Sequence, residues 1–303
     1  MSYQTRLRPL RNVSNAFTTF ISFRRDEVFY SFFIPAHQAN IIGETLNERI
    51  LSNRELKPLS KDYNLRGKLV FVMGGGKFGK KALRYLKDSG AKVLIVDINP
   101  TCKSSLEVDV LGEDLSVLDS LRPEQAAFLV GNAVDILVSL LETIIPDLVV
   151  TAIPGNVLAK VVEVWLAKRD IKLEPYTKVV PKVLANIPPS LVSSVDELSG
   201  VIVVSYMPSN MMCRENCLPP KGVCALTGKP KLGSVDKLLE FSVLNNTDVS
   251  GILYSKQLTG GLGAINGKEL HSLLKRLDDF HKPYTLCIGT ACDCHGILNL
   301  IKV

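Results

Sequence analysis

Residues 69–100 have the sequence LVFVMGGGKFGKKALRYLKDSGAKVLIVDINP, and this stretch decides the expected fold. The apolar run at 69–73 is typical of a buried strand, and it ends at three consecutive glycines. Apolar side chains then follow helical spacing over 77–88, before a second apolar run at 92–96 that ends in Asp97. The stretch therefore predicts a strand, a glycine turn, a helix and a second strand.

The glycines have the spacing G-x-G-x-x-G and lie where the predicted helix begins. A turn of this kind points free backbone N–H groups and the positive end of the helix dipole at one place, which suits a pyrophosphate. The first glycine makes the turn, the second lets a phosphate approach the backbone, and the third lets helix and strand pack closely. The predicted nucleotide contacts are Gly74, Gly75, Gly76, Lys77, Phe78 and Gly79.

Asp97 lies at the tip of the second predicted strand, where a carboxylate accepts hydrogen bonds from the hydroxyls of an adenosine ribose. Its charge would repel a 2′-phosphate, so NAD is the expected cofactor and NADP is disfavoured. Lys103 follows closely enough to weaken that preference. The alternative is a doubly wound domain whose glycine turn binds no ligand.

At these residues the chain resembles the Rossmann-type NAD(P)-binding families. It resembles in particular the nucleotide-binding domains of potassium-transport regulators and the saccharopine-dehydrogenase-like enzymes. The resemblance covers 69–100 closely and extends more loosely to about residue 170. It implies a dinucleotide without naming a reaction, and the regulators imply a sensor in which no chemistry occurs.

After residue 100 strands and helices continue to alternate, which predicts a parallel sheet with right-handed crossovers. A strand at 148–153 ends at Pro154 and Gly155, and a helix follows at 157–168. Ligands of such sheets bind outside the carboxyl ends of strands, so Pro154 and Gly155 are predicted to face the same crevice as the glycine turn. The alternative is an ordinary turn.

Two further strands are expected at 179–180 and 201–206. If the second is parallel to the others, it brings the cysteines that follow it to the nucleotide edge of the sheet. Beyond it, an apolar strand at 250–254, a glycine-rich turn and a helix at 268–280 repeat the earlier pattern, with Asn266 as the predicted helix cap. This second glycine turn is either an anion site or an ordinary turn.

The predicted fold class is α/β, and three regions are expected. Residues 1–64 form a small N-terminal element, with a strand at 27–35, a helix at 36–52 and a linker. Residues 65–210 form a doubly wound parallel-sheet domain of Rossmann type. Residues 211–303 form a C-terminal α/β cysteine-rich domain.

Six of the seven cysteines lie in the last 91 residues, which indicates a metal site or redox chemistry in a reducing compartment. Three thiolates on one stiff loop would repel one another without a cation. An iron–sulfur cluster is preferred over zinc because so many thiols accompany one nearby histidine; redox-active or inert thiols are the alternative. Cys287 is expected in the core and Cys102 as a structural residue. The candidate ligands are Cys213, Cys217, Cys224, Cys292 and Cys294.

Composition limits the function classes. The 303 residues are 46% apolar and 22% charged, as in soluble globular proteins, and no apolar run is long enough to span a membrane. Of the net charge of +6, residues 1–25 supply five arginines and no acid, which leaves about +1 for the rest and predicts no nucleic-acid binding. The basic N-terminus resembles a transit peptide, so the expected location is cytoplasmic, or organellar if that segment is a leader.

The sequence predicts a redox protein that couples an NAD site to a cysteine-ligated iron–sulfur or zinc centre and acts on a small molecule or a redox partner. The alternatives are a nucleotide sensor without catalysis and a Rossmann-type protein with a purely structural zinc. The enzyme class that fits best is an NAD(P)-dependent oxidoreductase. Homo-oligomer formation is left open, and no motif identifies a general acid or base.

Overall fold

The computed structural model describes 18–25 and 28–35 as strands, and residues 64–303 apart from 209–210, 212, 215, 219–221 and 281–282. The chain forms two units, Met1–Tyr63 and Asn64–Val303. In the first unit, β1 (Thr18–Arg25) and β2 (Val28–Pro35) pair antiparallel. The strand predicted at 27–35 is confirmed, whereas the predicted helix at 36–52 lies outside the described residues.

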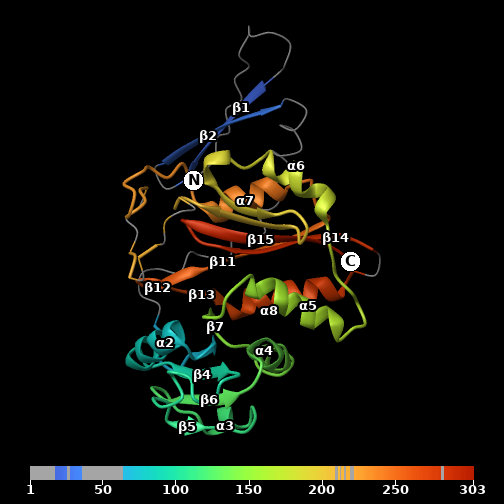
Figure 1. Cartoon of the computed structure of the whole chain (residues 1–303). Coiled ribbons are helices and arrows are strands. Elements are labelled where there is room, and N and C mark those ends of the chain that lie inside the picture. Colours follow the sequence, from blue (N-terminus) through green and yellow to red (C-terminus); the bar gives the residue numbers. More distant parts are fainter. Residues whose placement is uncertain are drawn as a thin grey trace. The chain divides into compact units, whose positions relative to one another are not determined.

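The second unit contains a seven-stranded sheet with the order β12-β13-β7-β3-β4-β6-β5 (Figure 1). The five strands from β7 to β5 run parallel to their neighbours, and the two at the other edge are antiparallel. The strands are β3 (Leu69–Met73), β4 (Lys92–Asp97), β5 (Val110–Leu111), β6 (Ala126–Val130), β7 (Leu148–Thr151), β12 (Lys256–Thr259) and β13 (Leu262–Asn266).

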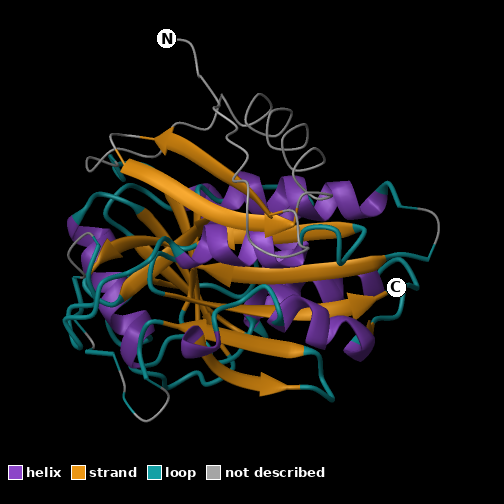
Figure 2. Cartoon of the chain, turned by 90° about the horizontal axis from the view of Figure 1, so that it is seen from above, coloured by secondary structure: helices purple, strands orange, loops and turns teal. Residues whose placement is uncertain are grey.

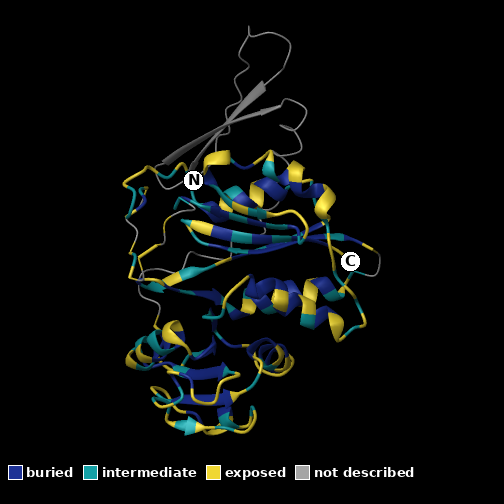
Figure 3. Cartoon of the chain, viewed as in Figure 1, coloured by how far each residue is buried: buried dark blue, intermediate teal, exposed yellow. Residues whose placement is uncertain are grey.

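Three helices connect successive strands of this sheet: α2 (Lys77–Asp88), α3 (Val117–Ser120) and α4 (Ala133–Leu141). Helix α5 (Val157–Ala167) leads from β7 to the second sheet. The predicted helix at 77–88 is confirmed, because its Ala82, Leu83 and Leu86 recur on one side and are buried. The strands predicted before and after it are confirmed as well. In Figure 3 the strands of this sheet are largely buried.

A second sheet has the order β11-β14-β15-β10-β9, with β8 paired to β15. Only β11 and β14 pair in parallel, and the other pairs are antiparallel. The strands are β8 (Glu174–Pro175), β9 (Val192–Asp196), β10 (Val201–Ser205), β11 (Val249–Tyr254), β14 (Thr285–Ala291) and β15 (His295–Lys302).

Helices cover both faces of the second sheet. On one face lie α5 and α8 (Gly267–Asp278), whose apolar side chains join those of the first sheet in one core. On the other face lie α6 (Val180–Leu184) and α7 (Val235–Val243), which pack in a second core against β10, β14 and β15 (Figure 1). The unit is therefore a mixed α/β structure of helices and strands (Figure 2).

The expected doubly wound parallel sheet is found only in part, since both sheets are mixed. The strand predicted at 201–206 is present as β10, but it is antiparallel to β9 and β15 and belongs to the second sheet. Its buried Ile202 and Val204 share a core with Leu298 and Leu300, which explains this choice of partner.

The strand predicted at 179–180 is wrong. Val179 ends a short 3₁₀ helix (Thr177–Val179) and Val180 begins α6, with Pro181 in the first turn, where proline fits a helix. The second glycine turn does not open a helix either. Gly261, with a φ of 68°, lies in the turn between β12 and β13, and α8 begins only after β13.

Across the described residues, no helix combines the length and the apolar character needed to cross a membrane. The predicted division of the second unit at residue 210 stays a prediction.

Candidate functional site

The glycine turn, residues 74–79, has the backbone features that its glycine spacing predicts. Gly74 has a φ of 94°, and its N–H donates to the carbonyl of Val96 at 2.8 Å. A Cβ on Gly79 would lie 1.9 Å from the carbonyl oxygen of Gly74. Glycine is therefore required at position 74 for the backbone conformation and at position 79 for the close packing of α2 on the turn.

Asp97 holds this turn from the end of β4. One of its carboxylate oxygens accepts the Gly75 N–H at 2.6 Å, and the other accepts the N–H of Asn99 at 2.8 Å. The sequence predicted a ribose contact for Asp97, which stays a prediction, and the structure shows this carboxylate supporting the turn. Each carboxylate oxygen has a second lone pair with which to accept a ligand hydroxyl.

Cys102 and Ser104 cover Gly75, a role that the sequence did not reveal. Ser104 donates its N–H and its hydroxyl to the Gly75 carbonyl at 3.0 and 2.9 Å. A Cβ on Gly75 would lie 2.2 Å from the Cys102 sulfur. The expectation that Cys102 is structural agrees with this buried packing, and Gly75 itself is closed to a ligand on that side.

The remaining part of the turn is exposed. A Cβ on Gly76 would meet no atom within 4 Å, and Lys77 and Phe78 beside it are exposed. Two exposed apolar residues lie beside Asp97. Ile98 follows it in the chain and has a relative exposure of 76%, and Val130 is its register partner on β6 and has a relative exposure of 56%. The carboxyl edge of the sheet thus presents helix N-terminal amides, a carboxylate and uncovered apolar side chains together.

The corner after β7 lies beside the glycine turn, because β7 neighbours β3 in the sheet. Gly155, with a φ of 90°, follows Pro154 and lines a pocket between α5 and the second sheet. Asn156 is buried there and donates to the side-chain oxygen of Asn299 at 2.8 Å. Gly155 therefore borders a pocket against the second sheet, and the hydrogen bond of Asn156 attaches the start of α5 to β15 of that sheet.

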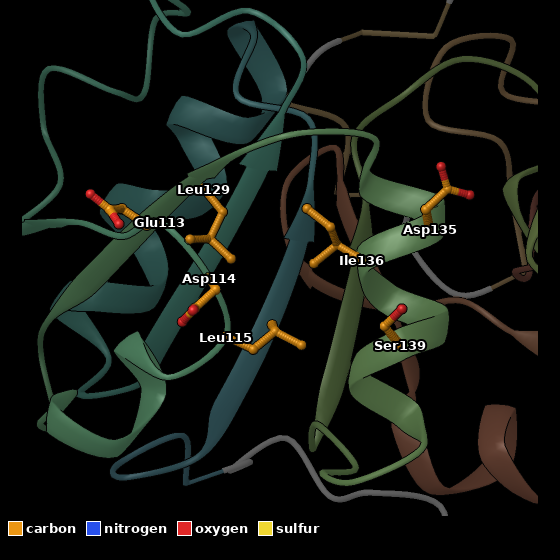
Figure 4. Close-up of a pocket in the computed structure, with 7 residues that line it drawn as sticks. All are labelled: Glu113, Asp114, Leu115, Leu129, Asp135, Ile136 and Ser139. Carbon is orange, nitrogen blue, oxygen red and sulfur yellow. The ribbon is translucent and has the colours of Figure 1, made fainter.

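A second pocket, which the sequence did not indicate, lies between the loop after β5 and helix α4 (Figure 4). Leu115, Leu129 and Ile136 supply its apolar wall, and Glu113 and Asp135 are acidic residues that line it. Asp114, also in the lining, accepts hydrogen bonds from the N–H and hydroxyl of Ser116.

Four of the predicted cysteines, Cys213, Cys217, Cys224 and Cys294, come near enough for three of them to act electrostatically on Cys213. Burial raises the pKa of Cys213 to about 11, together with a hydrogen bond to Cys217 and the negative charges of Cys217, Cys294 and Cys224. Each of those thiols therefore lies close enough to Cys213 for its charge to be felt. We call Cys213, Cys217, Cys224 and Cys294 the thiol cluster.

Cys224 lies in a small hairpin closed by a β-bridge between Val223 and Pro230. Its N–H donates to the carbonyl of Lys229 at 2.9 Å. Burial raises the pKa of the Cys224 thiol, but hydrogen bonds from Thr227 and from the Leu226 amide outweigh burial, and the net pKa is lowered. Amide donors around a sulfur stabilise a thiolate.

Cys292 and Cys294 belong to the turn that joins β14 to β15. A hydrogen bond from Cys294 lowers the pKa of Cys292 to about 7 against the opposing effect of burial. The same hydrogen bond, with burial, raises the pKa of Cys294. Lys231 donates from Nζ to the Cys294 sulfur at 2.9 Å. The turn therefore contains one acidic thiol and one thiol paired with an ammonium.

The donor chemistry of the thiol cluster fits a thiophilic ion or an iron–sulfur centre, since both are held by cysteine sulfurs. In the part of the chain that the structure describes, no three histidine, cysteine or acidic side chains already have a metal-holding arrangement. Cys287 is fully buried, as expected for a core residue.

Helix α2 connects the glycine turn to the segment that carries Cys213 and Cys217, which we call the cysteine loop. Lys81, one turn into α2, donates to the Asn216 side chain at 2.5 Å and to the Gly260 carbonyl. Gln257 of β12 donates to the Cys217 carbonyl at 2.5 Å. Residues Asn216 and Cys217 thus pack beside α2 and the β12–β13 hairpin, although the strand that precedes them, β10, is antiparallel to its neighbours and lies in the second sheet.

These features define a mixed α/β protein in which the helix that follows a partly exposed glycine turn contacts the segment carrying Cys213 and Cys217. Residues 69–155 match a family model described as the N-terminal domain of an uncharacterized protein, and residues 158–303 match the corresponding C-terminal domain. An uncharacterized protein of Archaeoglobus fulgidus is 31% identical over 232 residues, which are 76% of this chain and 98% of that protein. The chain belongs to the family defined by these two domains.

The predicted membership of the Rossmann-type NAD(P)-binding families is therefore wrong. The matching models describe neither potassium-transport regulators nor saccharopine-dehydrogenase-like enzymes. The resemblance depended on residues 69–100. A glycine turn between a strand and a helix is a local solution that α/β proteins of different families can share, so it does not determine family membership.

Proposed function

We propose that the protein is a redox protein that binds an adenine dinucleotide at the glycine turn, beside a metal centre held by the thiol cluster. The observation that carries the proposal is the contact of Lys81 with Asn216, because it joins the helix that begins at the glycine turn to the loop that holds Cys213 and Cys217. Two sites that are linked through one helix can serve one reaction.

The proposed dinucleotide site rests on the carboxyl edge of the first sheet. Four of its parallel strands have the order β6-β4-β3-β7, which is compatible with a Rossmann-type nucleotide-binding half, and the two-residue β5 is added at the edge beyond β6. The phosphates would approach Gly76, where the space is open, and Asp97 would accept the ribose hydroxyls. Ile98 and Val130 offer apolar surface for the base. The carboxylate favours NAD over NADP.

The proposed metal ligands are Cys213, Cys217, Cys224 and Cys294. An iron–sulfur cluster would supply one-electron chemistry, whereas zinc held by four thiolates would be structural. A reduced nicotinamide releases two electrons together as hydride, while a cluster accepts one electron at a time. A hydride therefore cannot pass directly from the nicotinamide to a cluster. The proposed hydride acceptor is instead a small molecule bound beside the thiol cluster.

The first test is to purify the protein without oxygen, measure its iron, zinc and sulfide, and titrate it with NADH and NADPH by fluorescence. We expect a stoichiometric metal centre and tighter binding of NADH. Iron with sulfide and broad visible absorption would identify the cluster, and zinc without colour the structural site. A protein that binds no metal, or one that binds no dinucleotide, would overturn the proposal.

Separate variants test the dinucleotide site and the metal site. Gly76→Ala adds a methyl group in open space, so it should leave the fold intact and weaken dinucleotide binding. Asp97→Asn keeps an oxygen for the Gly75 N–H but removes the charge, so it should reduce the preference for NADH over NADPH. Cys224→Ser should release the metal, and Cys287→Ala, in the core, is the matched control.

A further inference from the structure

Lys231 lies between the two chain segments that supply the thiol cluster. Its N–H donates to the carbonyl of Gly222 at 2.8 Å, which fixes it to the hairpin that carries Cys224. Its side chain crosses to the other segment, where Nζ donates to the Cys294 sulfur at 2.9 Å. One residue therefore ties the Cys224 hairpin to the turn between β14 and β15.

The turn that Lys231 reaches is held in place independently. Asp293, between the two cysteines of the turn, accepts hydrogen bonds from the Tyr254 hydroxyl at 3.2 Å and the Ser234 hydroxyl at 2.8 Å. The N–H of Cys292 donates to the carbonyl of His295 at 2.9 Å and closes the turn. The sulfur of Cys294 is thus presented to Lys231 by a fixed backbone.

Lys231 brings a positive charge to this position. A lysine ammonium is charged at neutral pH, the residue is only half-buried, and its Nζ donates to the Cys294 sulfur. A positive charge therefore adjoins the thiol cluster.

Four thiolates around a divalent ion leave two uncompensated negative charges, which are costly in a partly buried site. We propose that Lys231 compensates the charge of the thiol cluster and so tightens its hold on the metal. This inference rests on the proposed function for the existence of the metal centre. Lys231 would act as a positioning residue on Cys294, and it would not contact a substrate.

The test compares Lys231→Met, Lys231→Gln, Lys231→Arg and Lys229→Met in the full chain. Lys229 is an exposed lysine two residues away and provides the matched control. The apparent affinity for the bound metal is measured by competition with a chromophoric chelator. Loss of an outer-shell partner typically weakens metal affinity about 10- to 100-fold, which is the effect expected for the neutral variants. The arginine variant and the Lys229 control should stay near wild type.

The same set gives a second readout if the metal centre contains iron. Removing a positive charge beside a cluster disfavours its reduced form, so the midpoint potential of Lys231→Met should become more negative and that of Lys231→Arg should not. Neutral variants that hold the metal as wild type does would overturn the proposal. An arginine variant as weak as the methionine variant would also overturn it, because shape rather than charge would then matter. Wild-type protein without metal would instead overturn the proposed function.

Discussion

At the scale of single residues, the glycine turn depends on a close backbone contact between Gly79 and Gly74. Gly79 approaches the Gly74 carbonyl so closely that a Cβ would lie 1.9 Å from its oxygen and 2.9 Å from its carbon. Both atoms belong to the main chain of the turn, so a side chain at position 79 must push α2 away from β3. The neighbouring Gly76 has no such constraint.

We therefore expect Gly79→Ala to destabilise the protein by about 1–3 kcal/mol, the usual cost of overpacking a tight site. Gly76→Ala is the control and should change stability by less than about 0.5 kcal/mol. Urea unfolding followed by circular dichroism measures both. Equal stability of the two variants would show that the turn adapts to a methyl group at position 79.

Glu107 illustrates how a surface carboxylate makes stability depend on pH. Hydrogen bonds from Arg84 and Lys80 lower the pKa of Glu107 to about 2. The pKa of Glu107 is lower in the folded protein than in the unfolded chain, so its ionised form stabilises the fold. This contribution to the free energy of unfolding is complete above the usual glutamate pKa and is lost as the pH falls toward 2. The Glu107 side chain is only half-buried, with a relative exposure of 28%, so solvent screening limits the contribution of these ion pairs to stability.

Glu107→Gln should therefore be less stable than wild type at pH 7, and the difference should shrink as the pH falls from about 4.5 to 2. Denaturant titrations at several pH values measure the difference. Glu113→Gln is the control, since Glu113 is an exposed glutamate on the neighbouring loop. A difference that grows toward low pH would contradict the assignment of the ion pairs.

At the scale of secondary-structure elements, α8 owes its start to one side chain. Asn266 precedes the helix, and its oxygen accepts the N–H groups of Lys268 at 2.9 Å and Glu269 at 3.1 Å. The sequence predicted this cap. The same residue ends β13, which pairs with β7, so the cap also fixes where the sheet stops and the helix begins.

Replacing Asn266 with alanine should cost about 1 kcal/mol, because two helix amides lose their acceptor. Lys268→Ala is the matched control in the same helical turn, where the side chain is exposed. Thermal unfolding of both variants checks the prediction. If Asn266→Ala is as stable as the control, water satisfies the amides and the cap contributes little.

At the scale of the whole molecule, α2 is the physical link between the proposed sites. Its N-terminus carries the glycine turn, Lys81 reaches Asn216, and Tyr85 donates to the Leu258 carbonyl of β12 at 3.1 Å. A ligand that orders the start of α2 also favours one arrangement of the cysteine loop. Coupling through such a shared element is reciprocal for binding free energies.

We expect bound NAD to tighten metal binding by about fivefold or more, the lower range of measured couplings between sites. Lys81→Met should abolish this effect while each ligand still binds alone. Lys87→Met is the control, since Lys87 lies on the same helix but pairs with Asp109. Chelator competition with and without NAD measures the coupling, and an unchanged coupling in Lys81→Met would exclude α2 as the link.

Sequence by itself determined the elements whose signals are local. The apolar run before the glycines, the helical spacing after them and the capping position of Asn266 each depend on residues a few positions apart, and the structure places them as predicted. The burial of Cys287 followed in the same way from its apolar neighbours.

Only the tertiary structure decided which distant segments meet. The sequence could not assign β10 to the second sheet, pair Cys294 with Lys231, or bring Asn216 to Lys81, because these contacts join residues 63 or more positions apart. Sheet partners are selected by the apolar surface that they bury together, a property of the whole fold. The chemistry of the thiol cluster likewise depends on the charges that folding gathers around it.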